Sequence, residues 1–416
     1  MASKNLLSNP SLVESPFIIV KIGNKTFGQY TRTDKTNMFG STISVDYPNY
    51  MKKIQIEKIN GEIGKYIIGM EYQISAGDDP NMLEKVFSSV GYGEIEISYG
   101  DWSTPNYIFK NEKALITKVT SNVDFGQSRI NYTIEAVGTA LSIMGSRYDF
   151  PKRKAKPSNI IKSLVKNSTF GISSVFKAMA SFQNVINNNW IASDDKVVEI
   201  QAKSQTDIIS YINYLCSCMV SVSNTALNVI KDSNYYMSIH DNLAEGFQGA
   251  YFTIQKVLTN AANVDSYDTF EVDLGYPTTN YVTNFALSDN NTYSLLYKYS
   301  GKIGTSNYVY RIDNNGNTEQ IYSPSATRSK ELMKTTPTDE TWWTQITSYP
   351  ISATLTIKGL TRPSMLMSYV RIKSYFFGQL HAGSTGLFII TKQVDTIDQT
   401  GFKTTLSLTR IKGDVN

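Results

Sequence analysis

The chain has 416 residues, of which 41% are hydrophobic and 18% charged, and this is enough apolar material for two to four globular domains. Its formal net charge of +4 is spread along the sequence, and no apolar run approaches the length of a membrane span. The first residues lack the apolar core of a signal peptide, so none is expected. This composition excludes a chain too polar to fold.

The N-terminal third is predicted to be rich in antiparallel β-structure. Residues 1–15 are expected to form an arm, and alternating apolar residues then predict strands at 17–22, in both halves of 51–75, at 94–99 and in a hairpin over 111–137. The spacing of Met82, Leu83, Val86 and Phe87 fits either a short helix or a distorted strand. We therefore expect an antiparallel barrel or sandwich here.

The middle of the chain has helical periodicity instead. Ser158 is expected to cap a helix over 160–165, and a second helical pattern covers 175–186. Ser204 and Asp207 resemble a capping box before a third helix with apolar residues from 208 to 219. Short strands are predicted at 196–200, 220–222 and 234–239. Together these elements predict a small α+β domain.

Two features of the middle section resemble binding sites, but a structural role is favoured for each. Residues 152–156 (KRKAK) form the one basic cluster, but Pro151 and Pro157 flank it, and this favours a solvated linker over a nucleic-acid site. Cys216 and Cys218 are expected on different sides of the third helix, where they would fill the core and form neither a disulfide nor a zinc site.

The C-terminal part returns to β-structure around a polar insertion. Strands are predicted at 281–287, 351–358 and 369–374, and the chain ends in a hairpin. Residues 288–350 are polar and appear as an inserted region, in which Asn315-Gly316 predicts a hairpin between 308–312 and 318–322.

The final hairpin has a second copy near the start of the chain. Residues 115–136 and 389–410 align without a gap when Lys118 is placed on Lys392, an offset of 274 (392 − 118). Ile116-Thr117-Lys118 then matches 390–392, Asp124 matches Asp398, and Tyr132 and Ile134 match Leu406 and Leu408. The sequence thus predicts two copies of one β-domain with other material between them, and chance similarity of two hairpins is the alternative.

These pieces and their order resemble the central hub proteins of contractile phage tail baseplates, a family that includes late-control tail proteins and the hub part of type VI secretion spikes. The segments that carry the resemblance are Ala353–Gly359, Met367–Ile372, Gly386–Thr391, Gly401–Arg410 and the helical landmarks Lys156–Val165 and Gln201–Cys218. The polar insertion at 288–350 has no counterpart in this pattern.

The resemblance implies a mainly β chain with two tube-like antiparallel β-barrel domains, a small α+β domain and an inserted hairpin-containing region. The implied boundaries are an arm at 1–15, a first barrel at 16–150, an α+β domain at 151–245, a second barrel at 246–287 and 351–416, and the inserted region at 288–350.

For function, the resemblance implies a non-enzymatic virion protein of the tail baseplate, made in the host bacterial cytoplasm. Such hubs are trimers whose six barrels match a six-fold tail tube while three-fold symmetry is kept for a central spike. The implied partners are two further copies of the chain, tail tube or tube-initiator proteins, the spike, the tape measure protein and DNA in transit, with no stable membrane insertion and no cofactor.

A search for catalytic, cofactor or metal sites in the sequence identifies none. His240 and His381 lack the spacing of metal ligands, and Glu94 and Glu96 share a strand face, where a solvated surface is favoured over paired catalytic acids. Residues 301–307 lack the P-loop pattern, and 313–317 lack the distal Glu of a calcium loop.

A second function stays open from the sequence: a tail-tip protein that binds a receptor or carbohydrate through 288–350. Trp342-Trp343 would suit a sugar platform, although aromatic residues are equally enriched at subunit interfaces.

Overall fold

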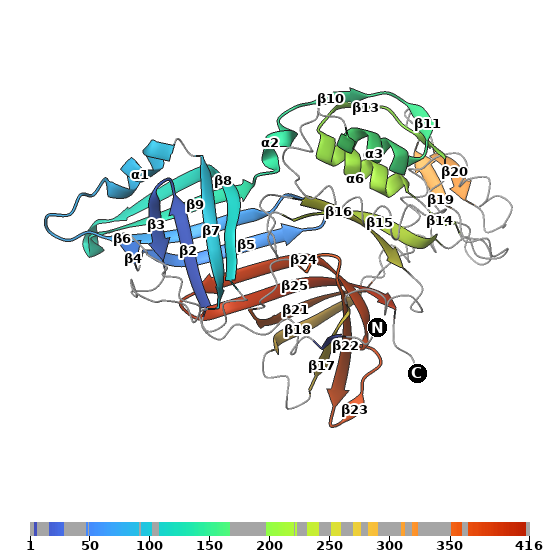
Figure 1. The fold of residues 1–416 in the computed structure, drawn as a ribbon. Helices are drawn as coiled ribbons and strands as arrows, with labels where there is room; N and C mark the ends of the chain where they lie inside the picture. Colours follow the sequence, from blue (N-terminus) through green and yellow to red (C-terminus); the bar gives the residue numbers. More distant parts are fainter. Residues whose placement is uncertain are drawn as a thin grey trace.

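The computed structural model describes most of the β-structure and part of the middle section (Figure 1). The described residues are 4–5, 16–28, 47–48, 50–90, 93–101, 108–166, 197–219, 221–222, 231–240, 251–258, 269–275, 282–289, 309–312, 318–322, 351–359 and 365–412. Four stretches discussed from the sequence lie outside them: the second predicted helix (175–186), residues 301–307, residues 313–317 and Trp342-Trp343.

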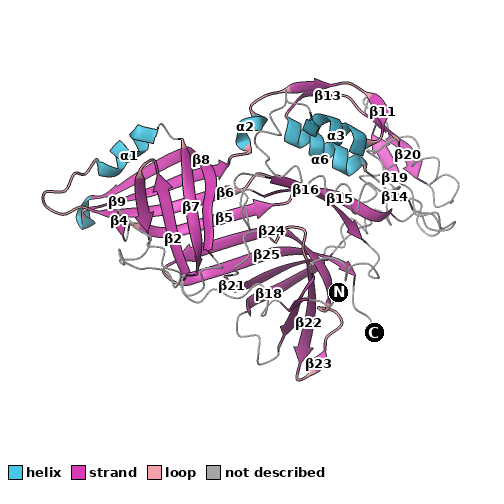
Figure 2. Cartoon of the chain, in the orientation of Figure 1, coloured by secondary structure: helices cyan, strands magenta, loops and turns pink. Residues whose placement is uncertain are grey.

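Sixteen strands form one mostly antiparallel sheet, so the prediction of a mainly β chain is confirmed (Figure 2). Its main path runs β1-β17-β22-β24-β5-β6-β9-β8-β7-β2-β3-β4. Between the described strands, the pairings join two β-units edge to edge, and no pairing closes either unit into a separate barrel.

The first β-unit contains the predicted N-terminal strands. Its strands are β2 (Pro16–Ile22), β3 (Lys25–Gly28), β4 (Tyr47–Pro48), β5 (Met51–Ile59), β6 (Lys65–Gln73), β7 (Glu94–Asp101), β8 (Ile108–Asp124) and β9 (Arg129–Gly138). Residues 82–87 lie in a helix, α1 (Met82–Val90), whose apolar side packs on the unit's core through Leu83 and Phe87. Of the two predicted alternatives, helix and distorted strand, the helix is therefore correct.

The second β-unit is assembled from distant parts of the chain. Its strands are β1 (Lys4–Asn5), β17 (Thr269–Leu274), β18 (Val282–Asp289), β21 (Ile351–Lys358), β22 (Tyr369–Phe376), β23 (Gln379–Leu380), β24 (Gly386–Asp398) and β25 (Gly401–Lys412). Its core contains Leu355, Ile372, Phe388 and Leu406. The predicted strands at 281–287, 351–358 and 369–374 are all present.

A third core lies in the middle section, where α3 and α6 pack together. Its elements are α2 (Leu141–Met144), β10 (Tyr148–Phe150), β11 (Arg153–Ala155), α3 (Pro157–Lys166), β12 (Val198–Ile200), β13 (Lys203–Thr206), α6 (Ile208–Cys218), β14 (Ser221–Val222), β15 (Lys231–His240) and β16 (Tyr251–Leu258). The predicted hairpin of the insertion is present as β19 (Val309–Ile312) paired with β20 (Thr318–Tyr322).

Both helix caps predicted for this section were placed wrongly. Helix α3 begins at Pro157, and the amides of Asn159 and Ile160 donate to the carbonyl of Lys156, so Ser158 lies inside the first turn. Proline suits the first helical position because its missing N–H is not needed there. The cap of α6 is Asp207 itself, whose carboxylate accepts from the Ser210 amide at 2.9 Å.

The basic cluster is also not a linker. Arg153–Ala155 forms β11, which pairs antiparallel with β12, and Lys152 Nζ lies 2.5 Å from Glu199 Oε1. The ion pair lowers the pKa of Glu199. The sequence reading failed here because a strand of three residues is too short to show alternation.

Cys216 and Cys218 are both buried, as predicted. Within the described part of the chain, no helix is both long and apolar enough to cross a membrane.

Candidate functional site

The two predicted copies of the hairpin are the same structure. In the first, β8 pairs with β9, and the ladder shifts by one residue between Ile116 and Lys118. In the second, β24 pairs with β25 and shifts between Ile390 and Lys392, which are the positions matched by the offset of 274. A β-bulge at the same place in both copies is a specific feature of local geometry.

The bulged residue is a threonine that makes the same hydrogen bond in each copy. Thr117 donates its hydroxyl to the carbonyl of Glu135 at 3.1 Å, and Thr391 donates to the carbonyl of Ser407 at 3.2 Å. Each bond ties the bulge to the strand opposite.

The alignment without a gap is wrong in the returning strand. Val119 pairs with Ile134, and Gln393 pairs with Leu406, so Ile134 is equivalent to Leu406 and not to Leu408. The cause is the turn, which contains four residues (125–128) in the first copy and two (399–400) in the second. Because a two-residue shift preserves the alternation of a strand, the sequence match survived the error.

The equivalence extends beyond the hairpins to whole units. Strand β6 pairs with β9 and β5 with β6, just as β21 pairs with β25 and β18 with β21. Strand β7 pairs with β8 as β22 pairs with β24. Through these pairs, Ile54 is equivalent to Phe285. One difference is direction, because β2 is antiparallel to β7 while β17 is parallel to β22.

The two units meet where β24 pairs antiparallel with β5, and this joint is the candidate functional site. The register runs from Lys392 opposite Ile59 to Asp398 opposite Lys53. In Figure 1 the red β24 lies along the blue β5, although they are more than 300 residues apart in sequence. Strand β24 therefore forms a hairpin with β25 and also extends the sheet of the first unit.

Apolar side chains fill one end of the joint. Ile397 and Phe402, from the tip of the second unit's hairpin, belong to the core of the first unit and are at most 5% exposed. The rings of Phe402 and Tyr99 make an edge contact with centroids 6.2 Å apart. The tip of one unit thus completes the core of the other.

Buried polar side chains fill the other end. Lys58 Nζ lies 2.8 Å from Glu112 Oε1, and both side chains are at most 1% exposed. The Tyr66 hydroxyl donates to the same Glu112 oxygen at 2.9 Å. A buried ion pair of this kind contributes little net stability, but removal of one partner is strongly destabilising because a bare charge is left behind.

The second unit adds a buried carboxylate beside this pair. Asp395 accepts hydrogen bonds of 2.7 Å from Thr404 and from Gln393, and the oxygen of Gln393 accepts from the amide of Met365 at 2.7 Å. Burial raises the pKa of Asp395 to about 6, although Thr404, Lys58 and Gln393 all act to lower it. The joint thus contains two buried polar clusters, one from each unit, and the charge of Lys58 acts on Asp395 across it.

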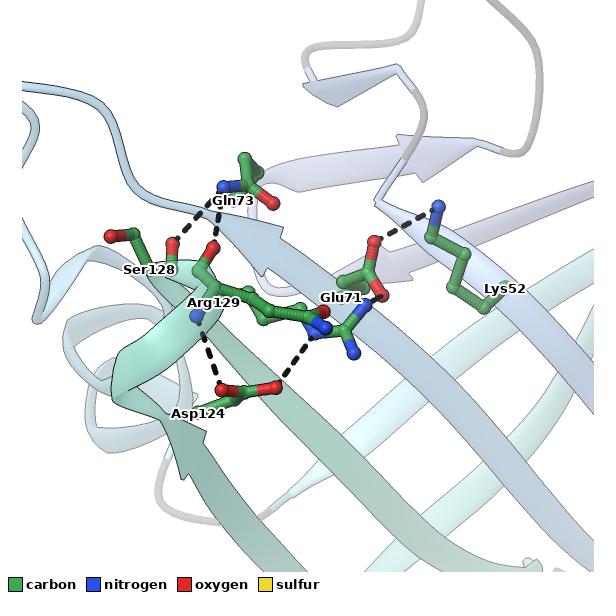
Figure 3. A network of polar contacts seen from close by, with 7 residues as sticks. Lys52, Glu71, Gln73, Asp124, Ser128 and Arg129 are labelled. Carbon is green, nitrogen blue, oxygen red and sulfur yellow. Dashed lines mark hydrogen bonds and ion pairs between the residues drawn. The ribbon is translucent and has the colours of Figure 1, made fainter.

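Ion pairs between side chains hold the turn at the end of the β8–β9 hairpin (Figure 3). Arg129 contacts Asp124 at 3.4 Å and Glu71 at 3.3 Å. Gln73 donates to the carbonyl of Ser128 at 3.3 Å, and Ser128 itself adopts a left-handed φ of 49°. These contacts fix the tip of the first copy in one conformation.

The residues considered for chemistry do not come together. Glu94 pairs with Lys113 at 2.5 Å and Glu96 with Lys21 at 3.5 Å on the solvated face, as the sequence reading favoured. His381 hydrogen-bonds Ser384 in a turn, at 2.7 Å. Across the described ranges, no group of three or more His, Cys, Asp or Glu is placed to hold a metal ion.

The polar residues of the joint were missed from the sequence, although a signal was present. Lys58 continues the alternation of Ile54 and Ile56, and Asp395 precedes Ile397 by two, so both polar residues occupy core positions. A charged residue in phase with a buried stripe is a sign of a paired interior charge.

The arrangement defines a class: a β-protein with two equivalent sheet units joined edge to edge, with a helical section between them in the sequence. No protein-family model and no curated protein sequence matches the chain.

Two solved structures of tail proteins have the same fold. The 43 kDa tail protein of prophage MuSo2 from Shewanella oneidensis matches with a TM-score of 0.52 and 11% identity, over 96% of this chain and 98% of that one. The tail protein from Neisseria meningitidis MC58 matches with a TM-score of 0.51 and 7% identity, over 95% and 97%. The chain has the fold of these tail proteins, in agreement with the resemblance seen in the sequence.

Proposed function

We propose that this chain is a structural protein of a phage-type tail, and that it forms the hub of the baseplate. Three copies surround the tail axis, and each contributes two β-units to a ring of six. The ring stacks on a six-fold tail tube or its initiator protein, while the trimer keeps three-fold symmetry toward a central spike. The tape measure protein and then DNA pass along the axis, and the protein resides in the virion.

The observation that carries this proposal is the duplication with its joint. Two units with the same strand order, the same bulge and the same threonine hydrogen bond are joined within one chain through β24 and β5. Units that are alike can occupy similar places in a ring, and a fixed joint between them sets the angle from one place to the next.

The role proposed for the joint is mechanical and not catalytic. Its buried ions are saturated by one another and by Tyr66, Gln393 and Thr404. Lys58 on β5 acts electrostatically on Asp395 on β24, and a slipped register would separate these two buried groups.

The copy number of the chain in assembled particles tests this proposal. Quantitative mass spectrometry of purified tails, with the tube protein as internal standard, should give three copies per tail. A larger number, or a position away from the tube end in labelled particles, would instead support the receptor- or carbohydrate-binding alternative. In the insertion to which that alternative assigns binding, the structure describes the last two residues of β18 and the strands β19 and β20.

A further inference from the structure

Two strand edges in the described sheet resemble the internal joint but have no strand beside them. Beyond its bulge, β8 pairs with β9 on one side, and its pairing with β7 ends at Leu115, so the other side of 117–124 is open among the described residues. Among the described strands, β18 pairs with β21 alone. These edges are the equivalents of β24 and β5, which pair with each other.

The side chains on the open edge of β8 are exposed where their equivalents are buried. Asp395 and Ile397, on β24, are 2% and 0% exposed because they face β5 and the first core. The equivalent residues of β8 are Ser121, which is exposed, and Val123, which is 44% exposed. Val123 thus has the position of a core residue without the core that would cover it.

The same contrast holds for the other edge. Ile54 and Ile56, on β5, are both 0% exposed at the joint. Their equivalents on β18 are Phe285, which is partly buried against the second core, and Leu287, which is 37% exposed. The chain therefore presents both strand edges that such a joint requires, and no described strand covers either of them.

The protection of both edges against pairing is limited to their ends, where a bulge lies between Ile116 and Lys118 in β8 and between Val282 and Asn284 in β18. Soluble proteins commonly block edge strands with charges, proline or bulges along the exposed stretch. Residues 283–288 (TNFALS) contain no charge and no proline, and in 117–124 (TKVTSNVD) the charges lie near the two ends. These edges are therefore suited to accept a strand.

We propose that β8 of one copy of this chain pairs antiparallel with β18 of a second copy, in the register of the internal joint. The inference rests on the proposed trimer and specifies its contact. Because Ile397 lies opposite Ile54 and Asp395 opposite Ile56, Val123 lies opposite Phe285 and Ser121 opposite Leu287. Internal and intermolecular joints then alternate around the ring.

The second copy is the occupant that the structure favours, because the chain already displays both halves of the contact. The tip of the β8–β9 hairpin is fixed by the Arg129–Asp124 and Arg129–Glu71 ion pairs before any partner arrives (Figure 3). Val123 would cover the second core beside Phe285, as Ile397 covers the first. A prepared tip of this kind loses little conformational entropy on pairing.

Cysteine cross-linking tests the register. Residues directly opposite in an antiparallel pair have Cβ atoms roughly 4.5–5.5 Å apart, within reach of a disulfide or a short bismaleimide. The full-length variant Ser121→Cys/Leu287→Cys, mixed at oligomer-forming concentration, should give covalent dimers and closed trimers on a denaturing gel. The matched control Asn122→Cys/Leu287→Cys places one thiol on the opposite face and should stay monomeric on the gel.

The outcomes separate the inference from the proposed function. A native trimer that cross-links in the control pair, or in neither pair, overturns the register while leaving the hub intact. A chain that stays monomeric at all concentrations overturns both.

A second variant tests the same contact without cysteine cross-linking. Val123→Asp should weaken self-association by roughly tenfold or more, because the contact would bury the new charge. Asn122→Asp, on the opposite face of the strand, should not weaken self-association. Both positions are exposed in the single chain, so the folded monomer should form normally, with an unchanged circular dichroism spectrum. Equal association of the two variants would contradict the proposal.

Discussion

In the first β-unit, the face of β8 that carries Val123 is open, whereas in the second unit the equivalent face of β24 is buried against β5. The local structures are otherwise alike, down to the bulge and its threonine. The difference therefore lies in what each hairpin meets. The second hairpin meets the first unit of its own chain, through a joint that includes buried charges. The first hairpin presents Ser121 and Val123 on its open edge, and we assign them to a contact with a neighbouring copy.

The largest effect is expected where the comparison is simplest, in the two equivalent cores. Ile134→Asp and Leu406→Asp each place a charge at a position that is 0% exposed. Each should lower the free energy of unfolding by roughly 4 kcal/mol or more, measured by urea denaturation. Thr133→Asp, on the exposed face of β9, is the matched control. A small effect at either buried position would break the equivalence of the units.

Removal of one partner from the buried ion pair should have nearly as large an effect. Lys58→Met leaves Glu112 uncompensated and should cost roughly 3–5 kcal/mol of unfolding free energy. The double variant Lys58→Met/Glu112→Gln should recover part of this loss. Lys52→Met, which breaks an exposed ion pair with Glu71 at 3.2 Å, should cost less than about 1 kcal/mol. Equal effects of Lys52→Met and Lys58→Met on the unfolding free energy would contradict the burial of the Lys58–Glu112 ion pair.

The internal joint should also make stability depend on pH. Asp395 has a pKa of about 6 in the folded chain, against about 3.9 when unfolded. Between these values the folded chain binds more protons, so the unfolding free energy should fall as the pH rises from 4 to 6, by about 2 kcal/mol.

The variant Asp395→Asn provides the comparison for this pH effect. Its unfolding free energy, measured at both pH values, should lack the fall that is attributed to Asp395. Ser121→Ala, at the equivalent position of β8, should leave the wild-type pH profile unchanged. A profile that Asp395→Asn does not alter would remove Asp395 as the cause.

The smallest effect is expected at the shared bulge. Thr117→Val and Thr391→Val each remove one hydroxyl hydrogen bond to a strand carbonyl and should cost about 1 kcal/mol each, measured by thermal unfolding. Thr120→Val, an exposed threonine elsewhere in β8, serves as the control. Opposite signs for the two bulge variants would show that the repeated hydrogen bond has different roles in the two units.

Local sequence patterns predicted the strands well because alternation reports which face is buried. The repeat was found for the same reason, and so was the fold class. Turn length could not be read, because an alignment shifted by two residues still matches apolar to apolar, as Ile134 against Leu408 did. Short strands such as β11 could not be predicted either, since three residues are too few to show the alternation of buried and exposed side chains.

The joint could not be predicted from local patterns because it depends on pairing between β5 and β24. Nothing in the sequence around Lys58 indicates that Asp395 will lie near it. The alternation itself was predictable. Lys58 continues the buried positions of Ile54 and Ile56, so its charge requires a partner, but the sequence does not indicate which residue that partner is.

The most direct test of the central claim is a cryo-EM map of the oligomer formed by the purified full-length chain. We predict three chains and six β-units in one ring, with β24–β5 contacts within chains alternating with β8–β18 contacts between them. A monomer, or a ring joined through other strands, would contradict it.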